Sequence, residues 1–293
     1  MCQNRRVNLR GQPVRTGDLV HQAEREVSPE VCAFYCDTFG DRNAVYARER
    51  VAPPLLYHSE VYAHIDRWYL KRLVGNLHAR QEWLLFAPLR QGEKLLTRST
   101  VVERYRKRDR DFVVNEVDYC DARGRLLVRS RTHQSFLADD PDGGRDVVDR
   151  DSAAKKERRA VGEGDGPELA PVELLVDHAT CWRFSGPGRN YHTDAEEAKK
   201  LGFPDVVVQG MLSTCLVSQV MGNAHGLGWL AGGRMDVKLV NVLWGGERVK
   251  ARAKLRGESS EGGARRREYE VWVEKEDAKR TVVTVGTASA LLA

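Results

Sequence analysis

Apolar positions recur along this chain of 293 residues in two separate series of short runs. In one of these runs Val113, Val117 and Tyr119 alternate in part with charged neighbours, as the residues of half-buried strands do. The pattern predicts four strands in each series. They cover 77–86, 93–102, 111–121 and 125–137 in the first half, and 234–243, 247–255, 267–274 and 281–292 in the second.

Helix signals precede the first series of strands. Ser28 is a good N-cap and Pro29 fits the first helical position, so a helix is expected to run on through 32–39. A longer helix is expected from His58 to about residue 74.

The second half repeats this order. Asp194 is expected to cap a short helix, and Glu197 three residues later completes a capping-box pattern. Gly210 opens an apolar helix that is expected to reach about Met221. Helices followed by an antiparallel sheet, twice over, predict an α+β fold built from two similar units.

Residues 138–167 interrupt the pattern, since apolar residues are sparse there while turn formers and charges are dense. Such a composition is typical of an inter-domain linker. The sequence therefore predicts an N-terminal domain over 1–137, a flexible linker over 138–167 and a C-terminal domain over 168–293.

The composition, with 41% hydrophobic and 30% charged residues, is typical of soluble globular proteins. No run of eighteen apolar residues occurs, and the N-terminus lacks the apolar stretch of a secretory signal, so we expect no membrane association and a cytoplasmic protein. The six cysteines form no Cys-x-x-Cys pair, which indicates buried thiols and no metal site. The net charge of +5 comes from basic residues interleaved with acids, as in 104–111, so nucleic-acid binding is not expected.

The stretch from Gly186 to Gly210 holds the clearest chemical signal. It combines a polar turn, His192, a helix start and a second helix opened by glycine. Histidine titrates near neutral pH and therefore suits proton transfer. A glycine at a helix start lets a substrate oxygen approach free backbone N–H groups. Together they indicate acid–base chemistry beside a carbonyl or oxyanion site.

The same stretch resembles the signature of the MaoC-like hydratases and dehydratases, hot-dog-fold enzymes that act on acyl thioesters. The resemblance covers about 40 residues, and the positions that match are Ser185, Gly186, His192, Asp194 and the run 206–211. The aspartate of that signature falls on Pro187 here, and its asparagine falls on Arg189.

The resemblance implies a double hot dog, that is, two tandem hot-dog domains, each with a long central helix wrapped by a curved antiparallel sheet. It also implies a homodimer and an acyl-thioester substrate. Coenzyme A, favoured over a carrier protein, would be part of that substrate, and no metal or redox cofactor is implied. A mildly basic surface suits the phosphates of such a carrier.

The resemblance assigns His192 as the general acid/base that adds water to a 2-enoyl thioester or removes it from a 3-hydroxyacyl thioester. The amides around Gly210 and Met211 would stabilise the enolate. Asn190 and Arg189 would position the substrate. Ser218 stands where some family members carry an active-site serine.

Each of these roles has a structural alternative. His192 could fix a loop and Gly210 could allow close helix packing. Ser218 could be a core serine, and Arg189 could pair with a local acid as readily as with a substrate carboxylate or phosphate.

Proline at position 187 cannot transfer a proton, so another acid is needed or the chemistry uses one side chain and water. Four residues are candidate substitutes. Asp41 lies in a first-half copy of the motif whose histidine position is Tyr46, Glu60 and Asp66 lie on the expected first-half helix, and Asp194 more simply caps its helix.

Two other functions stay open. A hot-dog thioesterase would use the same helix start but would need Glu60 or Asp66 as its base. A non-catalytic double hot dog would bind an acyl thioester or stabilise a partner subunit, and the lesions at Pro187 and Tyr46, one in each half-site, favour it.

Overall fold

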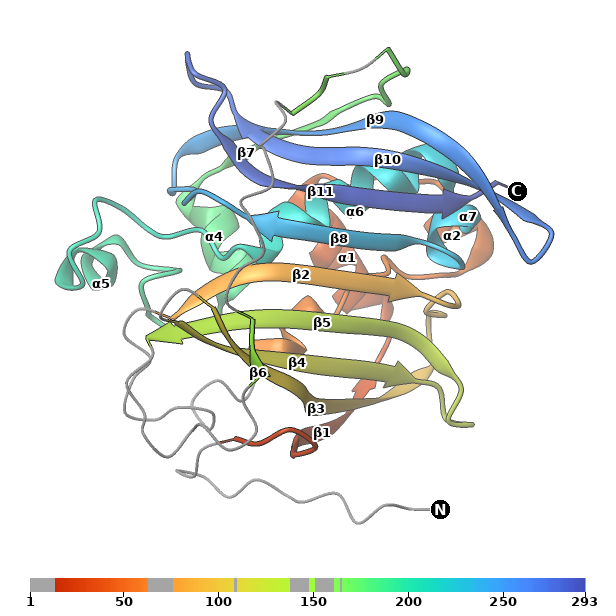
Figure 1. Cartoon of the computed structure of the whole chain (residues 1–293), viewed down its shortest axis with the longest axis horizontal. Coiled ribbons are helices and arrows are strands. Elements are labelled where there is room, and N and C mark those ends of the chain that lie inside the picture. Colours follow the sequence, from red (N-terminus) through yellow and green to blue (C-terminus); the bar gives the residue numbers. More distant parts are fainter. Residues whose placement is uncertain are drawn as a thin grey trace.

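The computed structural model describes residues 14–62, 76–107, 110–137, 148–150, 161–163 and 165–292. Its strands form one continuous antiparallel sheet in the order β1-β3-β4-β5-β2-β8-β11-β10-β9-β7, with the short β6 pairing parallel to β3 (Figure 1). The strands are β1 (Leu19–Glu26), β2 (Leu77–Leu85), β3 (Lys94–Lys107), β4 (Arg110–Cys120), β5 (Leu126–Leu137), β6 (Val148–Asp149), β7 (Val172–Val176), β8 (Arg234–Leu239), β9 (Glu247–Glu261), β10 (Ala264–Lys275) and β11 (Val282–Leu291).

The strand order is the same when it is followed outward from the centre in either direction. β2, β5, β4, β3 and β1 on one side correspond to β8, β11, β10, β9 and β7 on the other. The two halves are therefore related by a pseudo-twofold axis at the β2–β8 pair. The Arg80 guanidinium donates to both carboxylate oxygens of Asp236 across this junction, at 2.6 Å each, and so ties the two halves together.

The helices begin and end at residues with local reasons to do so. α1 (Pro29–Phe39) starts at Ser28, whose hydroxyl accepts from the Val31 N–H, and it ends at Gly40, which has the left-handed conformation. The other helices are α2 (Val45–Glu49), η1 (His58–Tyr62), α4 (His178–Ser185), α5 (Ala195–Lys200), α6 (Met211–His225) and α7 (Leu227–Leu230).

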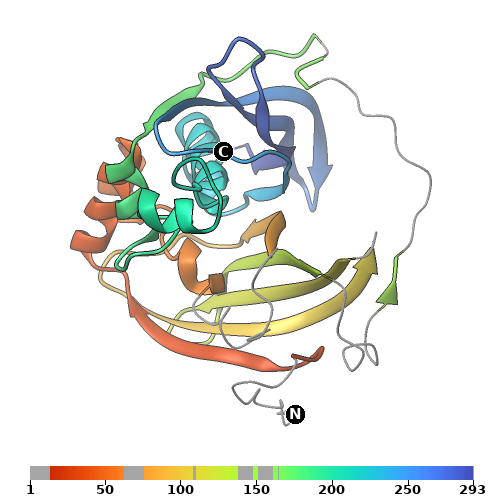
Figure 2. The ribbon, with the colours of Figure 1, turned by 90° about the vertical axis from the view of Figure 1, so that its left-hand side faces the viewer.

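α6 is the central helix of the second half. The strands β9, β10 and β11 pack against it, and the sheet curls around it (Figure 2). Every residue from Met211 to Gly222 is buried, polar ones such as Ser213, Thr214 and Gln219 included, so protein surrounds this helix on all sides. The expected long helix of the first half is described only as η1, and the rest of it lies outside the described residues.

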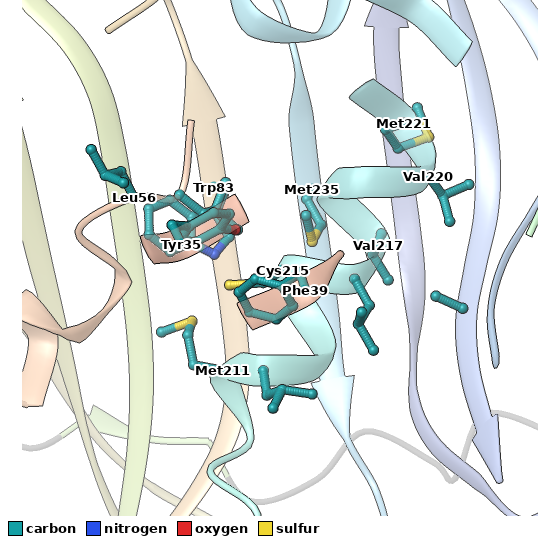
Figure 3. Packing of buried hydrophobic residues seen from close by; sticks show 14 of the residues in the cluster. Tyr35, Phe39, Leu56, Trp83, Met211, Cys215, Val217, Val220, Met221 and Met235 are labelled. Carbon is teal, nitrogen blue, oxygen red and sulfur yellow. The ribbon is translucent and has the colours of Figure 1, made fainter. Parts of the chain in front are cut away.

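The hydrophobic core is shared by both halves (Figure 3). Tyr35 and Phe39 of α1 and Trp83 of β2 pack beside Cys215 of α6 and Met235 of β8. Burying side chains of this size stabilises a fold by about 1.5–3 kcal/mol each. The common core and the continuous sheet hold the two halves together.

The sequence pattern located eight of these strands and missed three, β1, β6 and β7. β1 and β7 are edge strands at opposite ends of the sheet, and only Val20 of β1 and Val176 of β7 are buried, so neither shows a clear apolar alternation. The short helices α2, α4 and α7 were also not predicted. The boundaries predicted for the two domains and the linker stay a prediction, since most of 138–167 lies outside the described residues.

Among the described residues, no helix has both the length and the apolar character needed to cross a membrane.

Candidate active site

The loop before α5 is fixed by its own polar side chains. The Asn190 amide oxygen accepts from the His192 N–H at 2.8 Å. The Thr193 hydroxyl donates to the Gly188 carbonyl at 2.7 Å and accepts from the Asn190 N–H at 3.0 Å. Asn190 thus shapes the turn that presents His192, and its role in positioning the substrate stays a prediction.

Asp194 caps α5, as the sequence predicted. One of its oxygens accepts from the N–H groups of Glu196 and Glu197, both at 3.0 Å, and the other accepts from Arg189 Nε at 3.0 Å. Arg189 and the helix amides hold the pKa of Asp194 below its ordinary value. The Asp194 N–H donates to the Asn190 carbonyl at 3.0 Å, and Glu197 pairs with Lys200, so the predicted capping box does not form. Of the two roles open for Arg189, the structure shows the local ion pair.

His192 is half-buried, and its ring lies against that of Tyr191 with centroids 4.0 Å apart. Its Nδ1 is 2.7 Å from the Val207 carbonyl oxygen. Because a carbonyl can only accept, Nδ1 carries the proton and Nε2 keeps the lone pair. Burial lowers the pKa of His192, which favours the neutral ring. The ring therefore presents a basic nitrogen at neutral pH.

The start of α6 leaves two N–H groups available to a ligand. The N–H groups of Leu212 and Ser213 donate to the carbonyls of Gln209 and Gly210, at 2.9 and 3.3 Å. Within the described part of the chain, neither Gly210 nor Met211 has a hydrogen-bond acceptor for its N–H. A helix start carries partial positive charge, so these two donors suit an oxygen that becomes negative.

Gly210 is also a packing position. A Cβ built there would lie 1.9 Å from Leu239 Cδ2, at the end of β8, and 3.7 Å from His78 Nδ1. Glycine therefore allows Leu239 to approach the backbone, and both expected roles of Gly210 are compatible with its surroundings.

Sequence reasoning did not find His78, the second residue of β2 in the first half. Its Nδ1 is 2.8 Å from the Tyr62 hydroxyl, and its Nε2 is 3.2 Å from Gln81 Oε1. A single histidine at the start of a strand carries no recognisable signal. Only the pairing of β2 with β8 brings it to the start of α6.

Ser218 lies in the core, two turns along α6 from Gly210. Its hydroxyl accepts from Trp229 Nε1 at 3.0 Å, which ties α7 to α6. This is the packing alternative for Ser218.

Asp41 is buried and its carboxylate is occupied. It accepts from the Tyr46 hydroxyl at 2.9 Å and from the Asn43 N–H at 3.1 Å. The loop that holds it lies against Gly222, where a Cβ would be 3.6 Å from Asn43 Nδ2. Gly222 is about 18 Å along the helix from Gly210, so Asp41 lies toward the opposite end of α6.

Among the described residues, Glu60 is likewise not hydrogen-bonded to His192. Glu60 is buried, and its two oxygens accept from Arg25 Nε at 2.7 Å and from the Thr97 hydroxyl at 3.0 Å. Asp66 lies outside the described residues. Within the part of the chain that is described, the site therefore contains one acid/base side chain from the predicted set and two backbone donors.

In the same part of the chain, no three His, Cys, Asp or Glu side chains come together as metal ligands would. Cys181 and Cys215 are buried, and burial raises the pKa of each thiol to about 12. Neither is a reactive nucleophile.

No protein-family model and no curated protein matches the sequence. Solved structures do match. A putative MaoC domain protein dehydratase from Chloroflexus aurantiacus J-10-fl superimposes with a TM-score of 0.69 and 14% identity over 95% of both chains. The conserved hypothetical protein Rv0216 from Mycobacterium tuberculosis, which has a double hotdog fold, superimposes with a TM-score of 0.61 and 14% identity over 92% of this chain and 93% of its own. The chain has a double hot-dog fold.

This confirms the fold expected from the motif. A further MaoC-like dehydratase covers 94% of this chain and 98% of its own, with a TM-score of 0.68 and 17% identity. At identities this low the similarity concerns the fold. In this double hot dog, α6 is the central helix of the C-terminal unit, and His192 and Gly210 lie on the loops that lead to it.

Proposed function

We propose that this double hot dog is a hydro-lyase that adds water to a 2-enoyl thioester and removes it from a 3-hydroxyacyl thioester. Coenzyme A is favoured over a carrier protein as the thiol. The observation that carries the proposal is the hydrogen bond from His192 Nδ1 to the Val207 carbonyl. It fixes the tautomer with a basic Nε2 and connects the base to the segment that leads directly into the free amides of Gly210 and Met211.

The reaction follows from these groups. The thioester oxygen accepts from the Gly210 and Met211 N–H groups. As a water oxygen bonds to C3, His192 Nε2 takes one of its protons, and the C2=C3 electron pair moves toward the thioester oxygen to form an enolate. The imidazolium then gives that proton to C2, so one molecule of water has been added and His192 is neutral again.

This sequence of steps needs no acid at position 187, because the same proton leaves the water and arrives at C2. Backbone donors of this kind contribute about 3 kcal/mol each to lowering the barrier. The fold similarity to structures named as MaoC-like dehydratases supports the proposal.

The loss of absorbance of a conjugated 2-enoyl-CoA tests the proposal. Short, medium and aromatic acyl chains are each mixed with the wild-type protein and with His192→Ala. We expect the signal to fall with the wild type and to persist with the variant. Equal rates for the two proteins would show that His192 is not the base.

Non-catalytic binding of an acyl thioester is the second candidate. Pro187 and the engagement of Asp41 by Tyr46 favour it, since both half-sites then lack a pair of proton-transfer groups. An acyl-CoA that binds without turnover would support it. Thioester hydrolysis is less favoured because Glu60 is held by Arg25 and Thr97, and release of free thiol would reveal it. A homodimer and a cytoplasmic location stay predictions.

A further inference from the structure

Tyr62, His78 and Gln81 form a hydrogen-bonded chain that reaches from the first half to the start of α6. The Tyr62 hydroxyl is 2.8 Å from His78 Nδ1, and His78 Nε2 is 3.2 Å from Gln81 Oε1. Nothing in the motif of the second half involves these three residues. They are a separate polar group beside the proposed site.

Gln81, at the buried end of these hydrogen-bonded side chains, determines the direction of each hydrogen bond. The Gln81 amide nitrogen donates to the Ser130 hydroxyl at 2.7 Å, and the Gln81 oxygen accepts from the Thr132 hydroxyl at 2.7 Å. These three side chains are fully buried. Since Gln81 Oε1 is an acceptor, His78 Nε2 must donate to it, and Nδ1 must accept the proton of Tyr62.

The protonation states agree with this direction. Burial lowers the pKa of His78 to about 4, so its ring is neutral at pH 7. Burial also raises the pKa of Tyr62, so its hydroxyl keeps its proton. Because that proton is directed at His78, the Tyr62 oxygen faces any ligand only as a hydrogen-bond acceptor.

The hydrogen-bonded side chains of Tyr62 and His78 lie beside the proposed site. His78 Nδ1 is 3.7 Å from the position that a Cβ of Gly210 would take, beside the two free amides. Since the Tyr62 oxygen is hydrogen-bonded to that nitrogen at 2.8 Å, it is also close to the helix start. Tyr191, which precedes His192, contributes to the raised pKa of Tyr62.

We propose that Tyr62, positioned by His78, accepts a hydrogen bond from the water that adds to the substrate. The inference rests on the proposed hydration. The water donates one O–H to His192 Nε2 and the other to the Tyr62 oxygen. The first proton passes to His192 and then to C2, the second stays on the new 3-hydroxyl group, and Tyr62 and His78 keep their own protons throughout. The first half thereby supplies the second contact to water that Pro187 cannot make.

Tyr62→Phe tests the contact, since it removes the oxygen and keeps the ring. We expect kcat for hydration of a 2-enoyl-CoA to fall about 100-fold, the usual cost of misplacing a reacting group. KM, and the Kd of a saturated acyl-CoA that cannot react, should change less than about threefold, because the water and not the acyl group has lost a partner.

Two variants of His78 separate positioning from packing. His78→Asn places an amide oxygen near the position of Nδ1 and can still accept from Tyr62, whereas His78→Leu cannot. We expect His78→Asn to keep kcat within about fivefold of the wild type and His78→Leu to lose about as much as Tyr62→Phe. If kcat and Tm fall equally in both variants, His78 has only a structural role, and its proposed positioning of Tyr62 is wrong.

Tyr105→Phe is a matched control. Tyr105 is bonded to His133 Nδ1 at 3.2 Å, and His133 Nε2 lies 2.9 Å from Glu82, so this is a second tyrosine–histidine pair. Glu82 and Gln81 are adjacent on β2 and point to opposite faces of the sheet. Tyr105→Phe should therefore leave kcat unchanged.

The outcomes distinguish this inference from the proposed function. Hydration that depends on His192 but proceeds at an unchanged kcat in Tyr62→Phe would overturn the role of Tyr62 alone. No hydration by the wild-type protein of any 2-enoyl-CoA would overturn the proposed function, and the role of Tyr62 with it.

Discussion

The two halves of the molecule contain the same turn with different chemistry. In the first half Asn43 Oδ1 accepts from the N–H of Val45, two residues on, at 3.0 Å. In the second half Asn190 Oδ1 accepts from the N–H of His192, also two residues on, at 2.8 Å. The ring that follows is Tyr46 in one case, one residue beyond the turn, and His192 itself in the other.

The surroundings of the two rings differ more than the turns do. Tyr46 donates to Asp41, and burial raises the pKa of that carboxyl group. His192 donates to a backbone carbonyl and keeps a basic nitrogen. The two halves of the sheet therefore share this turn. The loop of the first half is part of the core, whereas the loop of the second half carries the proposed chemistry.

The comparison predicts the largest effect at His192. We expect His192→Ala to lower kcat about 1000-fold, within the range that general acid–base groups contribute. The enoyl absorbance assay measures it, and His178→Ala, which removes an exposed histidine paired with Asp205, is the control. Equal losses of kcat in His192→Ala and His178→Ala would show that His192 is not the base.

The pH profile sharpens the same assignment. Because burial lowers the pKa of His192, this base stays unprotonated at a lower pH than an ordinary histidine does. We expect the decline of kcat with falling pH to be centred below pH 6.5. A decline centred above pH 6.5 would contradict the assigned environment.

The next largest effect is expected at Met211. Proline has no N–H and suits the first position of a helix, so Met211→Pro removes one of the two free donors. Met211→Ala also removes most of the buried side chain but keeps the backbone N–H donor. Because proline disfavours the αR conformation that Gly210 has, the two variants are compared only at equal Tm. We expect Met211→Pro to have a kcat about 100-fold below that of Met211→Ala. Similar values would show that this amide does not face the substrate.

Tyr46→Phe should lower the free energy of unfolding and leave kcat unchanged, whereas His192→Ala should lower kcat. Tyr46→Phe leaves a buried oxygen of Asp41 without its donor, which costs about 1–3 kcal/mol of unfolding free energy. Its kcat should match that of the wild type. Denaturant unfolding and the hydration assay measure the two quantities, and a large loss of kcat in a stable Tyr46→Phe would place the first-half loop in the active site.

The last prediction concerns only the pH dependence of stability, at the contact between the halves, where the His58 ring stacks on Phe184 with centroids 4.1 Å apart. Burial lowers the pKa of His58 from 6.5 to about 4. Between these values the unfolded chain binds the extra proton, so stability is lost as the pH falls from 6.5 toward 4, by up to about 1.4 kcal/mol per pH unit.

His58→Phe keeps a ring against Phe184 and removes the titration. Its free energy of unfolding should therefore depend less steeply on pH in this window. Chemical denaturation of both proteins at several pH values measures the slopes, and identical slopes would refute the assignment to His58.

The sequence predicted those features that depend on neighbours along the chain. The caps at Ser28 and Asp194, the start of α6 after Gly210 and eight strands all follow from local signals. The edge strands β1 and β7 were missed because an edge strand buries too few side chains to show a clear period.

The site was predictable only in part, for the same reason. His192 and Gly210 lie in one motif, so the sequence already indicated them together. His78 and Tyr62 come to Gly210 only because β2 pairs with β8, a contact between distant segments. No local pattern connects Ser218 with its donor Trp229. Asp41 and Tyr46 lie in one copy of the motif, but the pattern did not predict the hydrogen bond between them.

The central claim is that His192 transfers the proton of an adding water, and product analysis by mass tests it most directly. A 2-enoyl-CoA is incubated with the wild-type protein and with His192→Ala, and the acyl-CoA and the free thiol are both measured. The account predicts that the wild type forms 3-hydroxyacyl-CoA without releasing thiol and that the variant leaves the substrate unchanged. Release of free coenzyme A, or binding of the substrate by the wild type without any product, would contradict it.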